Sequence, residues 1–104
     1  MAVLEAVLAA PTAGAALDAI PEDWEAFVTG PEDGEFACGL KPPGVKGPIG
    51  RLYDRGIAQG RGETRLNAMW AAALWTRRTL AGMRERERKH GRQTGETPPE
   101  TTRI

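Results

Sequence analysis

Few side chains in this sequence could carry covalent or acid–base chemistry. The chain contains no serine, a single histidine, His90, and a single cysteine, Cys38. A nucleophilic cysteine needs a neighbouring base or a positive field, but Cys38 stands in a glycine-rich stretch with no His, Lys or Arg beside it. His90 follows basic residues at the expected end of a helix, where an imidazolium is stabilised without any catalytic role. We therefore predict no catalytic residues and a protein that is not an enzyme.

Motifs for metals, phosphates and other cofactors are also missing from the sequence. A metal site needs clustered cysteine, histidine or carboxylate ligands, whereas Cys38 and His90 lie far apart. The acidic residues between 22 and 35 lack the ordered spacing of a calcium loop. The glycines of segment 44–50 do not follow the Walker pattern, and Pro48 removes one of the backbone N–H groups that a phosphate loop would use. We expect no metal and no cofactor.

The charged residues are sorted along the chain. Residues 1–40 contain eight acidic residues and no basic ones, residues 41–92 contain thirteen basic and four acidic residues, and the formal net charge is zero. The two halves could fold against each other, or both could be solvated surfaces. The remaining alternative is that the basic half binds an acidic partner, which could be nucleic acid or protein.

The strongest predicted element is a long helix from about residue 63 to 89, because this stretch is rich in Ala, Leu, Met, Arg and Glu. Trp70 and Trp75 lie five residues apart, which places them about 140° apart around a helix. A wide apolar face that contains Trp70 is the natural core side, whereas Trp75 shares the other side with small residues. Trp75 could be covered by the N-terminal helices, or it could anchor another chain. The predicted partner-binding residues are Trp75, Ala68, Ala72, Thr79 and Arg78.

The basic half also allows nucleic-acid binding as an alternative. Residues 84–92 read RERERKHGR, and their acidic and basic residues could pair with one another on a solvated helix. If these cations instead meet phosphates, binding would depend steeply on salt. No helix-turn-helix or zinc-finger pattern is evident. The alternative nucleic-acid-binding residues are Arg61, Arg65, Arg77, Arg78, Arg84, Arg88, Lys89 and Arg92.

These elements predict an all-α fold of three or four helices in a single small domain of 104 residues. The best N-terminal helix is expected to begin at Pro21 and to end at Gly30, and a short hairpin around residues 35–40 is a weaker alternative within the segment that follows. Four regions are expected: acidic N-terminal helices over 1–30, a Gly/Pro-rich linker over 31–50, a helical basic region over 51–90 and an unstructured tail over 91–104.

The chain has few large apolar residues, because Leu, Ile, Val and Phe together number 18 of 104. Such a thin core favours stabilisation by a partner or by self-association. No apolar stretch is long enough to span a membrane, and a lone cysteine gives no sign of an oxidising compartment. A cytoplasmic or virion location is therefore expected. Residues 20–28, IPEDWEAFV, resemble a segment of some bacteriophage tail-assembly chaperones, although this short resemblance assigns no family and transfers no residue roles.

The sequence therefore favours a non-enzymatic helical protein that acts by protein–protein binding. It would be a subunit or adaptor of a larger assembly, such as a bacteriophage particle. Its partners would be other protein chains in a homo- or hetero-oligomer, and no membrane is implied. Nucleic-acid binding through the basic C-terminal half is the alternative function.

Overall fold

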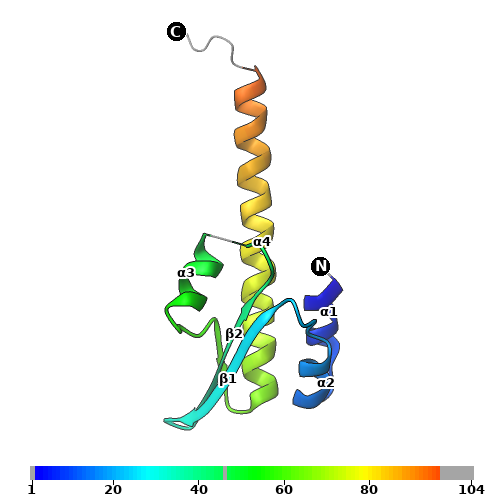
Figure 1. Ribbon diagram of the computed structural model, residues 1–104, viewed down its shortest axis with the longest axis vertical. Coiled ribbons are helices and arrows are strands. Elements are labelled where there is room, and N and C mark those ends of the chain that lie inside the picture. Colours follow the sequence, from blue (N-terminus) through cyan, green and yellow to red (C-terminus); the bar gives the residue numbers. More distant parts are fainter. Residues whose placement is uncertain (1, 46, 97–104) are drawn as a thin grey trace.

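The computed structural model describes residues 2–45 and 47–96, with side chains as far as Arg88 in the last helix. A three-stranded antiparallel sheet lies across the lower part of one long helix, with two short helices on one flank and a third on the other (Figure 1). In chain order the elements are α1 (Ala2–Ala9), α2 (Ala13–Asp18), β1 (Glu25–Glu32), β2 (Glu35–Lys41), α3 (Pro48–Asp54), β3 (Gly60–Gly62) and α4 (Arg65–Glu96).

The predicted all-α fold is wrong, because the middle of the chain forms a β-sheet. β1 pairs antiparallel with β2, and β2 pairs antiparallel with β3, in the spatial order β1-β2-β3. The helix expected from Pro21 to Gly30 is replaced by a turn and most of β1. The expected linker over 31–50 contains β2 and the start of α3. The sheet therefore occupies the segment that was expected to separate two helical halves.

The turn between β1 and β2 explains why this segment is not helical. Asp33 and Gly34 are its two central residues, and both have positive φ angles, 53° and 80°. A two-residue turn of this kind matches the right-handed twist of a hairpin, and Asp-Gly is one of its preferred pairs. Phe27, Val28 and Thr29 in β1 also belong to the residue types that favour strands. Together these signals outweigh the helix-start signal at Pro21.

One face of the sheet packs on α4 and forms part of the core. Val28 pairs with Cys38 in the β1–β2 register, and Leu40 shares their face because alternate residues of a strand point the same way. Cys38 and Leu40 are fully buried. β3 crosses α4 so closely that a Cβ on Gly60 would lie 2.1 Å from the backbone nitrogen of Ala72. Only glycine allows this contact between strand and helix.

The long predicted helix is present as α4, and it is one continuous element. Its start is capped by Thr64, whose hydroxyl oxygen accepts the backbone N–H of Asn67 at 3.0 Å. Its 32 residues span about 48 Å at a rise of about 1.5 Å per residue. This is most of the 56 Å length of the molecule, so α4 determines the elongated shape.

The tail expected over 91–104 is wrong in its first part. Residues 91–96 continue α4, because each glycine within a helix, here Gly91 and Gly95, costs only about 1 kcal/mol relative to alanine. Residues 97–104 lie outside the described residues. Despite its length, α4 is too polar to cross a membrane, and no other described helix is long and apolar enough to do so.

Trp70 and Trp75 lie at the two margins of the buried face of α4. The indole N–H of Trp70 donates to the carbonyl oxygen of Val7 in α1 at 3.1 Å, and Trp75 packs against the core of the same chain. Both rings are half-buried. The buried face is therefore centred between the two rings and not on the side of Trp70. The fully or nearly buried residues of α4 are Ala68, Met69, Ala72, Ala73, Thr76 and Leu80.

Candidate functional site

The C-terminal part of α4, residues 84–96, projects from the body and is called the arm below. Met83 still touches the body, because its Cε lies 3.5 Å from the position that a Cβ on Gly47 would take. Beyond this level no other described element runs beside the helix (Figure 1). The arm reads RERERKHGRQTGE and contains no aliphatic residue. It therefore lacks the apolar stripe that coiled-coil packing requires.

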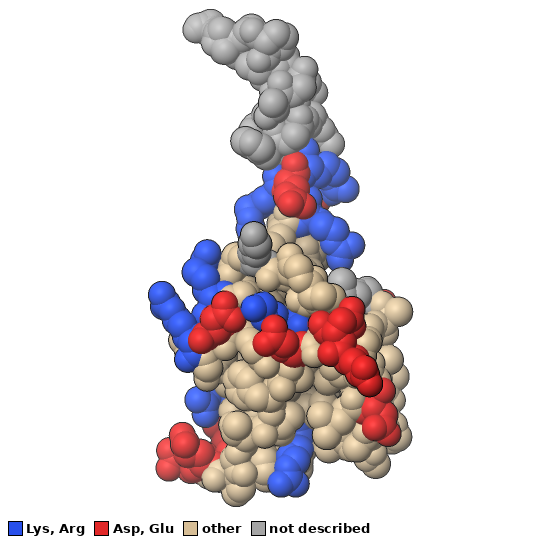
Figure 2. All heavy atoms as spheres, viewed as in Figure 1, with Lys and Arg blue, Asp and Glu red and all other residues tan. Residues whose placement is uncertain are grey.

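Basic side chains dominate the described part of the projecting helix, as Figure 2 shows. Arg77, Arg84 and Arg88 are spaced seven and four residues apart, which places them on one face of α4. All three are exposed. Arg88 pairs with Glu85 one turn away, whereas Arg77 and Arg84 form no ion pair with a described residue. Arg77 and, in the arm, Arg84 are therefore cations that no described residue neutralises.

The residues predicted for nucleic-acid binding divide into two separate groups. Arg61 lies on β3, and Arg65 lies at the start of α4 with its guanidinium 5.1 Å from the ring centre of Phe36. Twenty-three residues, or about 35 Å of helix, separate Arg65 from Arg88. The remaining predicted residues form the second group, which lies along α4 towards and within the arm: Arg77, Arg78, Arg84, Arg88, Lys89 and Arg92.

The residues predicted for partner binding are also separated by the fold. Ala68 and Ala72 are fully buried, because β3 lies directly on them at Gly60. The small residues that were expected to admit another backbone do admit one, but it belongs to the same chain. Trp75 and Thr79 are half-buried, and Arg78 is exposed. Partner binding at these last three residues stays a prediction.

A groove of about 600 Å³ opens on the outer face of the sheet, beside the hairpin turn. Phe27 and Ile57 supply apolar surface, and the side chain of Ile57 is 45% exposed. Glu32, Glu35 and Arg61 supply its charged groups. Helical periodicity could not reveal this groove, because its residues come together only through the hairpin and the loop before β3.

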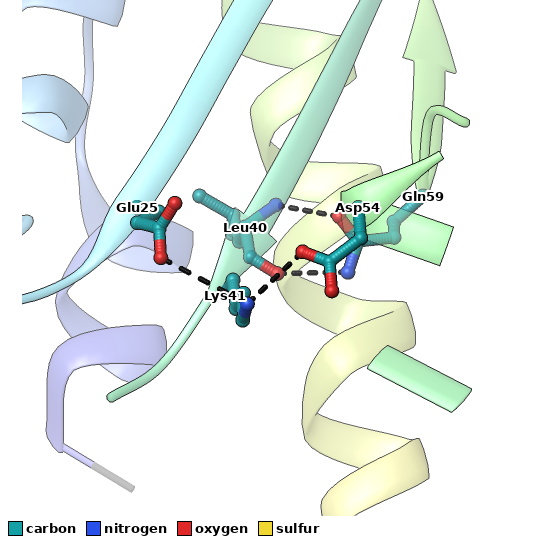
Figure 3. A network of polar contacts seen from close by, with 5 residues as sticks. All are labelled: Glu25, Leu40, Lys41, Asp54 and Gln59. Atoms are coloured by element: carbon teal, nitrogen blue, oxygen red, sulfur yellow. Dashed lines mark hydrogen bonds and ion pairs between the residues drawn. The ribbon is translucent and has the colours of Figure 1, made fainter. Parts of the chain in front are cut away.

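Polar contacts around Lys41 hold α3 against the hairpin (Figure 3). Its Nζ donates to Oδ1 of Asp54 at 3.0 Å and lies 3.9 Å from Oε2 of Glu25. The hydrogen bond to Asp54 is the main cause that raises the pKa of Lys41. The ring of Tyr53 lies 5.5 Å from that of Phe27, centre to centre. These contacts position α3 over the sheet, and their exposed charges are typical of a surface ion pair.

The environment of Cys38 is unsuited to nucleophilic catalysis. Its side chain is fully buried, and this burial raises the pKa of its thiol to about 12. Reactive cysteines have lowered pKa values and access to solvent. His90 lies within α4, six residues before its end. The part of the chain that the structure describes contains no group of three His, Cys, Asp or Glu side chains able to hold a metal ion.

Comparisons of the chain with protein-family models, with curated proteins and with solved structures found no significant match. Function must therefore be inferred from the arm, the groove and the charges that they carry.

Proposed function

We propose that this protein acts without catalysis, by binding other protein chains as a subunit or adaptor of a larger assembly. A bacteriophage particle is one such assembly, with the protein in the cytoplasm or the virion. The observation that carries the proposal is the arm, which continues α4 beyond the body without packing on another described element (Figure 1). Tertiary packing supplies most of the stability of a helix in a protein, and the arm has no such packing against another described element. A partner that covers the arm would therefore stabilise it.

The exposed edge of the sheet, at β1, is a second surface to which another chain could bind, by adding a strand. It is less suited to binding than the arm. β1 has only one neighbouring strand in the described sheet, and such an edge offers unpaired backbone groups. Glu25 and Glu32 are exposed on β1, and Pro31 of the same strand has no backbone N–H to donate to another strand. Charges and proline are devices that prevent edge-to-edge association. In the arm the backbone groups are paired within the helix, so a partner there would contact its side chains.

Site-specific photo-crosslinking in the cells that produce the protein tests this proposal. A photoreactive residue at Arg86, exposed on the arm, should give covalent adducts with a protein chain. The matched control is the same residue at Asp18, which is exposed at the end of α2. Protein adducts at position 86 that exceed those at position 18 would support the proposal. Equal or absent adducts at the two positions would contradict it.

Nucleic-acid binding is the second candidate, and the exposed row of Arg77, Arg84 and Arg88 favours it. Neutralising several phosphates would make the binding constant fall steeply with salt. Glu85 and Glu87 lie among these cations and weaken the attraction. A salt titration of binding to duplex DNA measures the number of phosphate contacts directly. A steep slope that disappears in an Arg77→Gln, Arg84→Gln double variant would favour this candidate over the first.

A further inference from the structure

Three carboxylates crowd the end of the hairpin. Glu32 and Glu35 lie directly opposite each other in the β1–β2 register, and Asp33 lies in the turn between them. All three are exposed, and none forms an ion pair with another described residue. Like charges directly opposite each other destabilise a strand pair. This end of the hairpin would therefore gain stability from a bound cation.

The groove beside these carboxylates has the chemistry to receive an arginine side chain. Glu32 and Glu35 line the groove together with Phe27 and Ile57. Carboxylates accept hydrogen bonds from the planar edge of a guanidinium, while the arginine stem can lie on aromatic and aliphatic surface. Arg61 also lines the groove, but it pairs with neither carboxylate among the described contacts. One cation against two carboxylates leaves the groove negative.

The matching arginines lie at the opposite end of the molecule. The hairpin reaches the start of α4, where Arg65 lies over the ring of Phe36, whereas the arm forms the other end (Figure 1). Arg84 is nineteen residues beyond Arg65, or about 29 Å further along a continuous helix. The arm cannot fold back onto its own hairpin, so the two surfaces can meet only between copies.

We infer that the partner of the arm is a second copy of this chain, an inference that rests on the proposed function. Arginines in the arm of one copy enter the hairpin groove of the next. Residues 84–92 of the arm contain five basic and two acidic residues, whereas the end of the hairpin contains Glu32, Asp33 and Glu35. Copies arranged head to tail would bring these opposite charges together. Because the contact joins two different surfaces, it forms either a ring or an open filament.

Charge reversal in the full chain tests this contact. The arm variant combines Arg84→Glu with Arg88→Glu, and the groove variant combines Glu32→Lys with Glu35→Lys. A control variant combines Arg51→Glu with Arg55→Glu, which reverses two exposed charges at α3 and changes the net charge as the arm variant does. Analytical ultracentrifugation over a range of protein and salt concentrations reports the association of each chain. Circular dichroism checks that each variant keeps its helix and strand content.

We expect the wild-type and control chains to associate, and to do so less at high salt. The arm variant and the groove variant should each show a dissociation constant raised at least about tenfold. An equimolar mixture of the two variants should associate again, because the unchanged arm of one then meets the unchanged groove of the other, and the reversed arm meets the reversed groove. A monomeric wild-type chain, or a mixture that stays monomeric, would overturn the inference.

The two proposals fail in different ways. If the wild-type chain is monomeric while the crosslinker at position 86 captures a different protein, this inference is overturned and the proposed function stands. If the chain is monomeric and the arm captures no protein, both are overturned. An arm that binds duplex DNA, in a chain that does not self-associate, would also overturn the inference.

Discussion

The side chain of Gln59 pairs with both backbone groups of Leu40, as an additional strand residue would (Figure 3). The N–H of Leu40 donates to Oε1 of Gln59 at 2.6 Å, and Nε2 of Gln59 donates to the carbonyl oxygen of Leu40 at 2.8 Å. The backbone N–H of Gln59 also donates to the carbonyl oxygen of Cys38 at 2.9 Å. β3 is only three residues long, so the amide of Gln59 extends its pairing with β2 into the core.

Replacing this amide should destabilise the protein markedly. Gln59→Leu keeps the side-chain size but leaves the buried N–H and C=O of Leu40 without partners, which costs about 2–4 kcal/mol of unfolding free energy. Urea denaturation measures the loss. The matched control is Asn67→Ala, which removes an exposed amide and should change stability by no more than about 0.5 kcal/mol. Similar losses in the two variants would contradict a special role for Gln59.

Two glycines should respond in opposite ways to substitution by alanine. A Cβ on Gly60 would meet the backbone of α4 at 2.1 Å, so Gly60→Ala must separate β3 from α4 and should cost at least about 3 kcal/mol. Gly14 lies within α2, and a Cβ there has no atom within 4 Å. Gly14→Ala should therefore stabilise the protein by up to about 1 kcal/mol through helix propensity. Thermal unfolding of both variants would show the opposite signs, and a neutral Gly60→Ala would refute the close crossing.

The two tryptophans should differ in what their indole nitrogens contribute. Trp70→Phe removes the N–H that donates to Val7 and loosens α1 from α4. Trp75 makes no hydrogen bond with a described residue through its indole, and Trp75→Phe removes a comparable amount of ring surface. We therefore expect Trp70→Phe to lower the unfolding free energy by about 1 kcal/mol more than Trp75→Phe does. Hydrogen exchange of the α1 amides should rise in the first variant only.

The buried thiol of Cys38 predicts a loss of stability in alkali. Its pKa is about 12 in the folded chain and about 9 in the unfolded chain, so above pH 9 the folded state binds the proton more tightly. The titration of Cys38 leaves the unfolding free energy unchanged below pH 9 and lowers it as the pH rises towards 12. By pH 10.5 the loss of unfolding free energy is about 2 kcal/mol. The pH profile of Cys38→Ala, measured by urea denaturation, should lack this part of the decline, and parallel profiles would contradict the assignment.

The hairpin could have been predicted from the sequence, although the helix-start signal at Pro21 favoured a helix. The pair Asp33-Gly34 is a strong local hairpin signal, and the flanking residues include the strand-favouring Phe27, Val28 and Phe36. The groove could not have been predicted from the sequence. Ile57 comes to line the same groove as Glu32 and Glu35 only through the pairing of β3 with β2. A three-residue strand of glycine and arginine carries no periodic signal.

Local chemistry was sufficient to determine that the C-terminal third would be helical, and the sorting of acidic and basic residues along the chain is visible in the sequence itself. These properties depend on residue type and on neighbours within a few positions. Only the tertiary structure determined which side of α4 is buried and what covers it. Ala68 and Ala72 would admit any backbone that approached closely, and it is Gly60 of the same chain that does so. The small size of these side chains indicates that a close contact is possible. Which segment makes the contact depends on strand pairing far away in the sequence.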